Sequence, residues 1–136
     1  MITAVDTSVL LDVFLADPKH GPASAEAIRS CLSQGSLVVC EVVWAETAAV
    51  FDREEDFVER MSRLAIRLMP STMSALWLAG QRWRAFRAGG GRRDRVVADF
   101  MIAANASKQC DRLLTRDRDF ALACFDGLVL IDPSRG

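Results

Sequence analysis

The first eleven residues read MITAVDTSVLL. Residues 2–5 are short, uncharged and rich in β-branched side chains, which is typical of a strand buried on both faces. Asp6 follows this strand, and either Thr7 or Ser8 can cap the helix that comes next. Open α/β sheets bind their ligands beyond the carboxyl ends of the strands. We therefore expect Asp6 to anchor a divalent-metal site that later carboxylates complete.

Length and composition indicate one globular domain over residues 1–136. Hydrophobic residues make up 51% of the chain and charged residues 26%, which excludes a disordered protein. No apolar run approaches the roughly 20 residues of a membrane-spanning helix. The first residues also lack the basic-then-apolar pattern of a signal peptide. We therefore expect a cytoplasmic protein with no membrane contact.

Cysteine and histidine usage argues against two common kinds of site. The four cysteines show no C-x-x-C spacing, and His20 is the only histidine, so a zinc site is not expected. A single histidine in a loop-like Pro-Lys-His-Gly-Pro segment also makes histidine acid–base catalysis improbable. We expect the cysteines to be reduced thiols that pack as small hydrophobic side chains.

The net charge of −1 hides an uneven distribution. Residues 1–59 carry 11 Asp/Glu and 3 Lys/Arg, a net charge of −8. Residues 60–136 carry 7 Asp/Glu and 14 Lys/Arg, a net charge of +7. A basic half beside an acidic half can hold a polyanion next to metal-binding carboxylates.

The hydrophobic pattern predicts a three-layer α/β/α sandwich with a mostly parallel central sheet, because predicted strands alternate with predicted helices. Gly89-Gly90-Gly91 ends one helix and is expected to form a flexible loop, since it lacks the features of a phosphate-binding loop. Strands are predicted at 2–5, 37–40, 65–69, 112–115 and 128–131. Helices are predicted at 8–17, 22–33, 42–53, 54–64 and 96–109, with another between the cap at Ser71 or Thr72 and Gly89.

One predicted helix carries an apolar stripe with two aromatic residues. We interpret the stripe as core packing and not as a surface for stacking bases. Its members are Leu76, Ala79, Trp83 and Phe86.

Four carboxylates lie where solvent is not expected to cover them. Asp6 and Asp117 each follow a predicted buried strand. Glu46 and Asp99 each share a helical stripe with apolar side chains, so both are expected to face the core side. The apolar partners are Val42, Val43, Ala49 and Val50 for Glu46, and Ile102, Ala103, Ala106 and Cys110 for Asp99.

For any one of these carboxylates, capping or an arginine partner is the simpler explanation. Taken together they point to a metal, because a doubly wound sheet can bring all four to one edge, where they repel unless a cation neutralises them. Oxygen ligands of this kind suit Mg²⁺ or Mn²⁺. Such ions can activate water for attack on a phosphodiester.

Four segments form a pattern along the chain: AVDTSVLL (4–11), VVCEVVWAE (38–46), ADFMIAA (98–104) and LLTRDRDF (113–120). In order and spacing they resemble the motifs of PIN-domain ribonucleases, and most closely those of the VapC toxins of bacterial toxin–antitoxin pairs. The resemblance implies an α/β/α fold, Mg²⁺- or Mn²⁺-dependent endonucleolytic cleavage of RNA and inhibition by a VapB-like antitoxin. It also suggests a homodimer, for which an apolar patch around residues 43–64 could serve.

The resemblance also implies roles for individual residues. The metal-binding and catalytic set is Asp6, Glu46, Asp99 and Asp117, with Asp119 close enough to assist. Thr7 or Thr115 is expected to hydrogen-bond the carboxylates or their waters. Two features depart from the family pattern: Asn105 stands where many relatives have a histidine, and residues 121–124 are less aromatic.

Arginines surround the glycine loop and also lie within the last of the four segments. The arginines around the loop could simply form a solvated helix face and loop, or some of them could bind RNA phosphates without sequence choice. Arg116 and Arg118 could equally stabilise transition-state charge or pair with neighbouring acids. The loop arginines are Arg82, Arg84, Arg87, Arg92, Arg93 and Arg95, and we assign RNA binding to Arg92, Arg93, Arg95 and Arg116.

Two other functions remain open on the sequence. A catalytically silent binding module could use the acidic pocket to hold a metal or the basic tail of an antitoxin. A phosphatase-like enzyme could form an aspartyl-phosphate at Asp6, although no convincing partner lysine follows a predicted strand.

Overall fold

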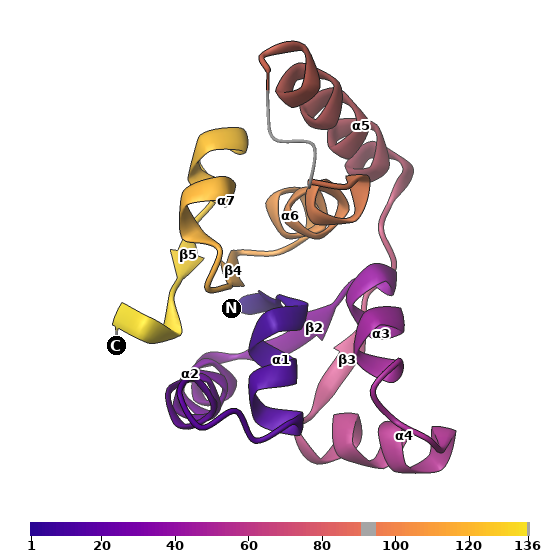
Figure 1. The fold of residues 1–136 in the computed structure, drawn as a ribbon, viewed down its shortest axis with the longest axis vertical. Coiled ribbons are helices and arrows are strands. Elements are labelled where there is room, and N and C mark those ends of the chain that lie inside the picture. Colours follow the sequence, from indigo (N-terminus) through magenta and orange to yellow (C-terminus); the bar gives the residue numbers. More distant parts are fainter. Residues whose placement is uncertain (91–94, 136) are drawn as a thin grey trace.

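The computed structural model describes residues 1–90 and 95–135, and within them five parallel strands form one sheet. The strand order is β3-β2-β1-β4-β5 (Figure 1). The strands are β1 (Ile2–Val5), β2 (Ser36–Val39), β3 (Ile66–Leu68), β4 (Arg112–Leu114) and β5 (Leu130–Ile131).

The central position of β1 follows from its sequence. Thr3, Ala4 and Val5 are buried, as expected for a strand covered on both faces. β1 pairs with β2 on one side and with β4 on the other, so the direction of strand addition reverses at β1. Such a reversal places a crevice beyond the carboxyl ends of β1 and β4. Asp6 and Thr115 are the residues that follow these two strands.

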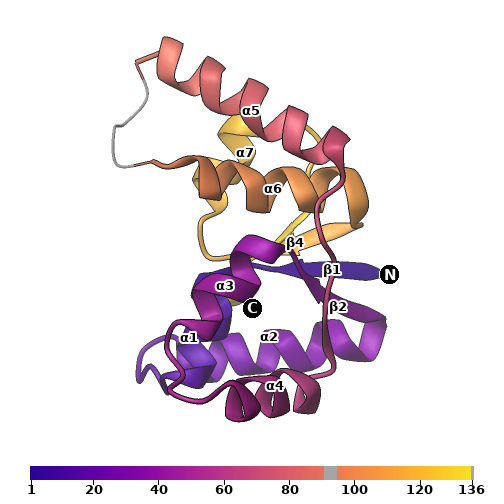
Figure 2. The same ribbon diagram turned by 90° about the vertical axis from the view of Figure 1, so that its right-hand side faces the viewer.

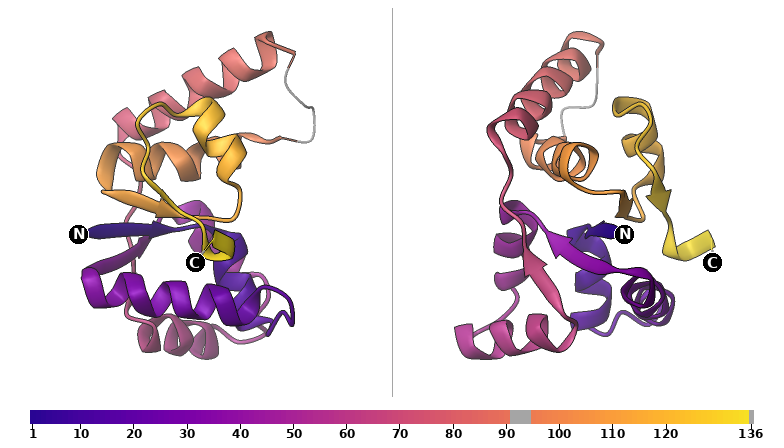
Figure 3. Two further views of the ribbon diagram at one scale, coloured as in Figure 1. Left: turned by 90° about the vertical axis from the view of Figure 1, so that its left-hand side faces the viewer. Right: turned by 180° about the vertical axis from the view of Figure 1, so that it is seen from behind.

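Helices cover both faces of the sheet, so the predicted three-layer architecture is confirmed. Figures 1 and 2 show α1, α2 and α4 on one side and α5, α6 and α7 on the other. The turn η1 (Pro133–Arg135) returns to α2 (Figure 3). The helices are α1 (Thr7–Phe14), α2 (Gly21–Gln34), α3 (Glu41–Ala48), α4 (Glu54–Arg63), α5 (Met73–Ala88), α6 (Val97–Gln109) and α7 (Arg118–Cys124).

Aromatic rings join the three helices of the second layer. Phe100 of α6 is fully buried and contacts Phe86 of α5 and Phe120 of α7, with ring centroids 5.5 and 5.0 Å apart. Both contacts are edge-to-face, the arrangement that aromatic pairs favour. Most of the predicted stripe on α5 therefore packs against the core, but its first member, Leu76, is 42% exposed.

The prediction that Glu46 faces the core side is wrong. In α3 only Val43 and Thr47 are buried, and Glu46 is exposed. The helix was predicted to continue to residue 53, but it ends at Ala48, after which Phe51 packs against Phe14 and Phe57. Residues 49 and 50 therefore do not extend the expected apolar stripe.

Other boundaries differ in smaller ways. Thr72 caps α5, with its hydroxyl accepting from the Ala75 N–H, and Gly89 ends that helix as predicted. The helix α7 was not predicted; it is seven residues long and contributes Phe120 and Ala121 to the packing. Along the described chain, no helix combines the length and apolar character needed to cross a membrane. All four cysteines are free thiols, as expected.

Candidate functional site

Asp6 lies at the carboxyl end of β1 and caps α1 with its own side chain. Its Oδ1 accepts a hydrogen bond of 2.7 Å from the Thr7 N–H, so neither Thr7 nor Ser8 is the cap that the sequence suggested. Its Oδ2 accepts from the Thr115 hydroxyl at 2.7 Å. Burial raises the pKa of Asp6, and the charges of Asp117 and Asp99 raise it further, against the lowering effect of these hydrogen bonds.

Asp99 and Asp117 converge on the same place from α6 and from the start of α7. Together with Asp6 they line one small pocket of about 20 Å³, which Phe120 also lines. The Thr115 hydroxyl links two of the acids, because it donates to Asp6 and accepts from the Asp117 N–H at 2.9 Å. The expected convergence of these three carboxylates is therefore present.

Glu46 joins this group through a threonine. The Thr7 hydroxyl donates to Glu46 Oε1 at 2.7 Å, while the Thr7 N–H holds Asp6. Glu46 does not line the small pocket, and its side chain is exposed. Thr7 and Thr115 thus make the carboxylate contacts expected of them. Asp119 is exposed in the first turn of α7.

Arg95 lies within the acidic group. Its guanidinium donates two hydrogen bonds to Asp117, with Nη1 2.5 Å from Oδ2 and Nη2 3.1 Å from Oδ1. Nη1 also lies 3.8 Å from Asp99 Oδ2, and the guanidinium lies 4.2 Å from the ring centroid of Phe120. Arg95 therefore supplies positive charge to two of the three acids. Arg92 and Arg93 lie outside the described residues.

The fit of these residues to a metal ion depends on how they are grouped and on the type of donor they offer. No set of three Asp, Glu, His or Cys side chains among the residues described is grouped so that it could hold a metal. The donors themselves suit a hard cation, because Asp6 is a partly buried carboxylate and two further carboxylates line the same pocket. The residue types fit Mg²⁺ or Mn²⁺. In this structure the carboxylate of Asp117 is paired with the guanidinium of Arg95.

Comparison with known proteins assigns the chain to a family. The sequence matches the PIN domain family over residues 3–126. The chain belongs to the PIN domain family. A search of curated proteins gives no significant match.

Solved structures with the same fold include toxin–antitoxin complexes. VapBC2 from Rickettsia felis, bound to a promoter DNA fragment, has a TM-score of 0.73 and 14% identity, with 97% of this chain and 98% of that chain covered. VapBC-1 from nontypeable Haemophilus influenzae has a TM-score of 0.73 and 18% identity, covering 98% and 99%. VapC20 from Mycobacterium tuberculosis, described as a sarcin-ricin loop cleaving toxin, has a TM-score of 0.62 and 21% identity, covering 93% and 96%.

Arg116 of this PIN domain is paired with a buried acid that the sequence analysis did not single out. Its Nε and Nη2 donate to the two carboxylate oxygens of Asp12, whose Oδ2 also accepts from the Ser24 hydroxyl at 2.7 Å. Asp12 lies between apolar residues of α1, and this position was the signal that could have identified it. The sequence left open whether Arg116 stabilises transition-state charge or pairs with an acid, and in the structure it pairs with an acid.

Asn105 of the PIN domain lies away from the acidic pocket. Its side-chain amide donates to the Met69 carbonyl and to the Ser71 hydroxyl, both at 3.1 Å. Ser71 in turn donates to Glu41 of α3 through its hydroxyl and its N–H. The departure from histidine at position 105 therefore affects the connection between β3 and α5, not the carboxylates.

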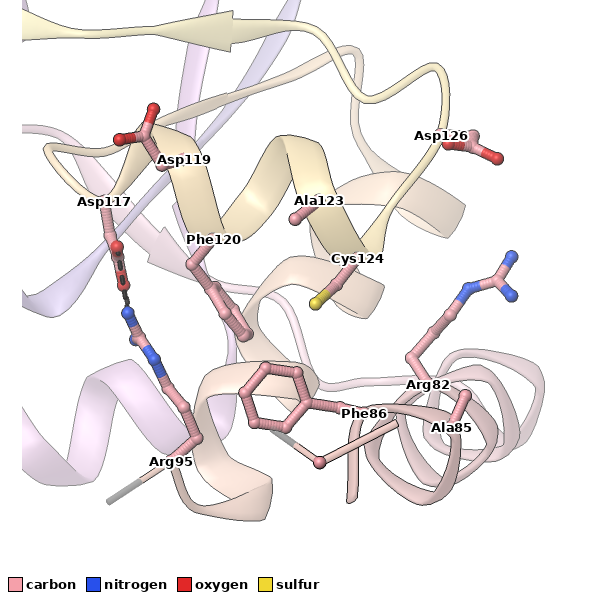
Figure 4. Close-up of a pocket in the computed structure, with 11 residues that line it drawn as sticks. Arg82, Ala85, Phe86, Arg95, Asp117, Asp119, Phe120, Ala123, Cys124 and Asp126 are labelled. Carbon is pink, nitrogen blue, oxygen red and sulfur yellow. Dashed lines mark hydrogen bonds and ion pairs between the residues drawn. The ribbon is translucent and has the colours of Figure 1, made fainter. Parts of the chain in front are cut away.

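A larger pocket adjoins the acidic one. It lies between α5 and α7, has a volume of about 770 Å³ and shares Asp117 and Phe120 with the small pocket (Figure 4). Asp119 lines this larger pocket, beside Asp117.

Proposed function

We propose that this PIN domain is a metal-dependent endoribonuclease that acts as the toxin of a type II toxin–antitoxin pair. The observation that supports this function is the meeting of Asp6, Asp99 and Asp117 at one pocket, with Glu46 attached through Thr7. Family membership and the VapBC complexes of the same fold support the same function class.

The proposed metal ligands are Asp6, Glu46, Asp99 and Asp117, with Asp119 assisting. The chemistry that bound Mg²⁺ or Mn²⁺ supplies is activation of a water and stabilisation of the departing oxygen of the phosphodiester. Thr115 orients Asp6 and Asp117, and Thr7 orients Glu46. This arrangement needs no histidine, which agrees with the position of His20 at the start of α2.

RNA binding is assigned to the basic half of the chain. Arg95 lies beside Asp117 and is close enough to the proposed reaction centre to meet a phosphate. Arg116 is held by Asp12, so its contact with RNA stays a prediction, as do those of Arg92 and Arg93. Phosphate contacts of this kind provide affinity without sequence choice.

The proposed partner is a VapB-like antitoxin, supported by the VapBC complexes among structures of this fold. A homodimer is proposed as well, and exposed Val50 and Val58 lie in the apolar region around residues 43–64 that was expected to form it. The cytoplasmic location stays a prediction.

A catalytically silent binding module is the second candidate. The pairing of Asp117 with Arg95 favours it, because an acidic pocket that already holds one guanidinium can accept a basic side chain of a partner. The aspartyl-phosphate alternative is less well supported, since both carboxylate oxygens of Asp6 already accept hydrogen bonds.

The test is RNA end mapping with purified protein, with and without Mg²⁺ or Mn²⁺, for the native chain and for Asp6→Asn and Asp99→Asn. The nuclease proposal expects metal-dependent cleavage by the native chain and none by folded variants. Full activity in both variants would refute it. A native chain that binds its antitoxin tightly but cleaves no RNA would establish the binding module.

A further inference from the structure

The larger pocket has an aromatic and apolar wall, in which the rings of Phe86 and Phe120 meet edge to face at 76°. Phe86 of α5 and Phe120 of α7 lie on one side, with ring centroids 6.3 Å apart, and Ala123 and Cys124 lie along α7 (Figure 4). Its volume of about 770 Å³ is within the usual range for sites that bind small organic groups. Aromatic and apolar walls of this kind are where proteins place unstacked bases of single-stranded RNA.

Among the described residues that line this pocket, the charged side chains do not suit a phosphate. Arg95 is already engaged by Asp117, which leaves Arg82 against two exposed carboxylates, Asp119 and Asp126. A phosphate placed among these groups would meet more negative than positive charge. Groups that donate hydrogen bonds to carboxylates are favoured instead.

Arg82 and Asp126 lie at the same end of the pocket in Figure 4. No ion pair joins Arg82 to an acidic side chain in the described parts of the chain, so its guanidinium and the Asp126 carboxylate both present polar atoms there. Arg82 and Arg95 both act to lower the pKa of Cys124, which burial raises. Both arginines line the same pocket.

We propose that this pocket binds an unpaired guanine of the RNA substrate next to the scissile phosphate. Guanine offers an acceptor, O6, beside two donors, N1–H and N2–H₂, which match a guanidinium beside a carboxylate. Asp126 accepts from the donors, Arg82 donates to O6, and the base lies against the apolar wall. The inference rests on the proposed ribonuclease function, because the pocket shares Asp117 with the carboxylates assigned to it.

The test measures binding in EDTA, where no metal-dependent cleavage occurs. Two labelled RNAs are compared by fluorescence anisotropy: a short uridine tract with one guanosine, and the same tract with one cytidine. Ala123→Trp fills the pocket, and Leu122→Trp is the matched control, because Leu122 is 47% exposed on the same helix and does not line the pocket. Arg82→Gln and Asp126→Asn remove the groups that read the base, and both residues are exposed.

The native chain is expected to bind the guanosine RNA about tenfold more tightly than the cytidine RNA, the size of one stacked and hydrogen-bonded base. Ala123→Trp, Arg82→Gln and Asp126→Asn should lose this preference, and Leu122→Trp should keep it. Equal binding of the two RNAs by the native chain overturns the proposal, as does an unchanged preference in Arg82→Gln and Asp126→Asn. If Ala123→Trp fails to fold, these two variants decide.

The two proposals fail separately. A native chain that prefers guanosine in EDTA but never cleaves with Mg²⁺ or Mn²⁺ supports the pocket and refutes the nuclease. A chain that cleaves with metal but shows no base preference supports the nuclease and refutes the pocket.

Discussion

Arg116 and Asp12 form a two-pronged ion pair, with Nε 2.8 Å from Oδ2 and Nη2 3.0 Å from Oδ1. The Asp12 side chain is 5% exposed, so Arg116 and the Ser24 hydroxyl take the place of water as partners of its carboxylate. Arg116 lies in sequence between Thr115, which holds Asp6, and Asp117. The pair therefore ties α1 to the segment that positions two of the carboxylates.

Asp12→Ala should lower the free energy of unfolding by about 3 kcal/mol, because it leaves a partly buried guanidinium without its carboxylate. It should also reduce cleavage of RNA, since the segment that follows β4 loses its anchor. Urea unfolding measures the first effect. The control is Glu26→Ala, which breaks the exposed Glu26–Arg29 pair and should change stability by about 0.5 kcal/mol or less. Equal effects of the two substitutions would contradict the role given to Asp12.

Thr7→Val should reduce RNA cleavage by about 10- to 100-fold while preserving the fold, because Glu46 loses the hydroxyl that orients it. The backbone N–H that caps Asp6 is unchanged by this substitution. Thr7→Ser keeps the hydroxyl and is the matched control. Single-turnover cleavage rates with excess Mg²⁺ provide the measurement, and a Thr7→Val rate equal to that of the native chain would remove Thr7 from the site.

The parts of the fold that local sequence determines could be predicted. Residues 2–5 form a buried strand and Asp6 follows it. Both features could be predicted because an uncharged, β-branched run and the acidic residue that ends it are adjacent in the sequence. The parallel sheet could be predicted from the alternation of strands and helices, and the apolar stripe that includes Asp99 could be predicted from helical spacing.

What could not be predicted depends on contacts between distant residues. Glu46 is exposed because α3 buries the face that carries Val43 and Thr47, and the choice of that face depends on tertiary packing that helical spacing does not reveal. Arg116 and Asp12 are 104 positions apart, so their pairing could only be named as one alternative. The placement of Arg95 on Asp117 had no local signal at all.

Arg95→Ala should strengthen Mn²⁺ binding by about tenfold, because Asp117 and Asp99 lose a cation that competes with the metal. Titration calorimetry or the Mn²⁺ electron-spin signal measures this without any cleavage. Arg84→Ala, which removes an exposed charge of the same helix-rich layer, controls for the general effect of lower positive charge. Weaker Mn²⁺ binding in Arg95→Ala than in Arg84→Ala would show that Arg95 helps to build the metal site.

Cys110 makes the stability of the fold sensitive to alkaline pH. Burial, with a smaller effect from the charge of Asp111, raises the pKa of this thiol from 9.0 to about 11. Because the folded pKa is higher than the unfolded one, the thiol's contribution to stability is complete below pH 9 and is lost as pH rises toward 11.

Cys110→Ala should therefore reduce the loss of stability across this window by about 1–2 kcal/mol. The chain contains no tyrosine, so few other groups titrate in the same range. Urea unfolding on either side of the window measures the effect. Cys31→Ala is the control, because Cys31 is also a free thiol and is buried, but lies on α2. If stability falls as steeply with pH in Cys110→Ala as in the native chain, the alkaline sensitivity belongs to another group. Cys40 is then the next candidate, because burial also raises its pKa.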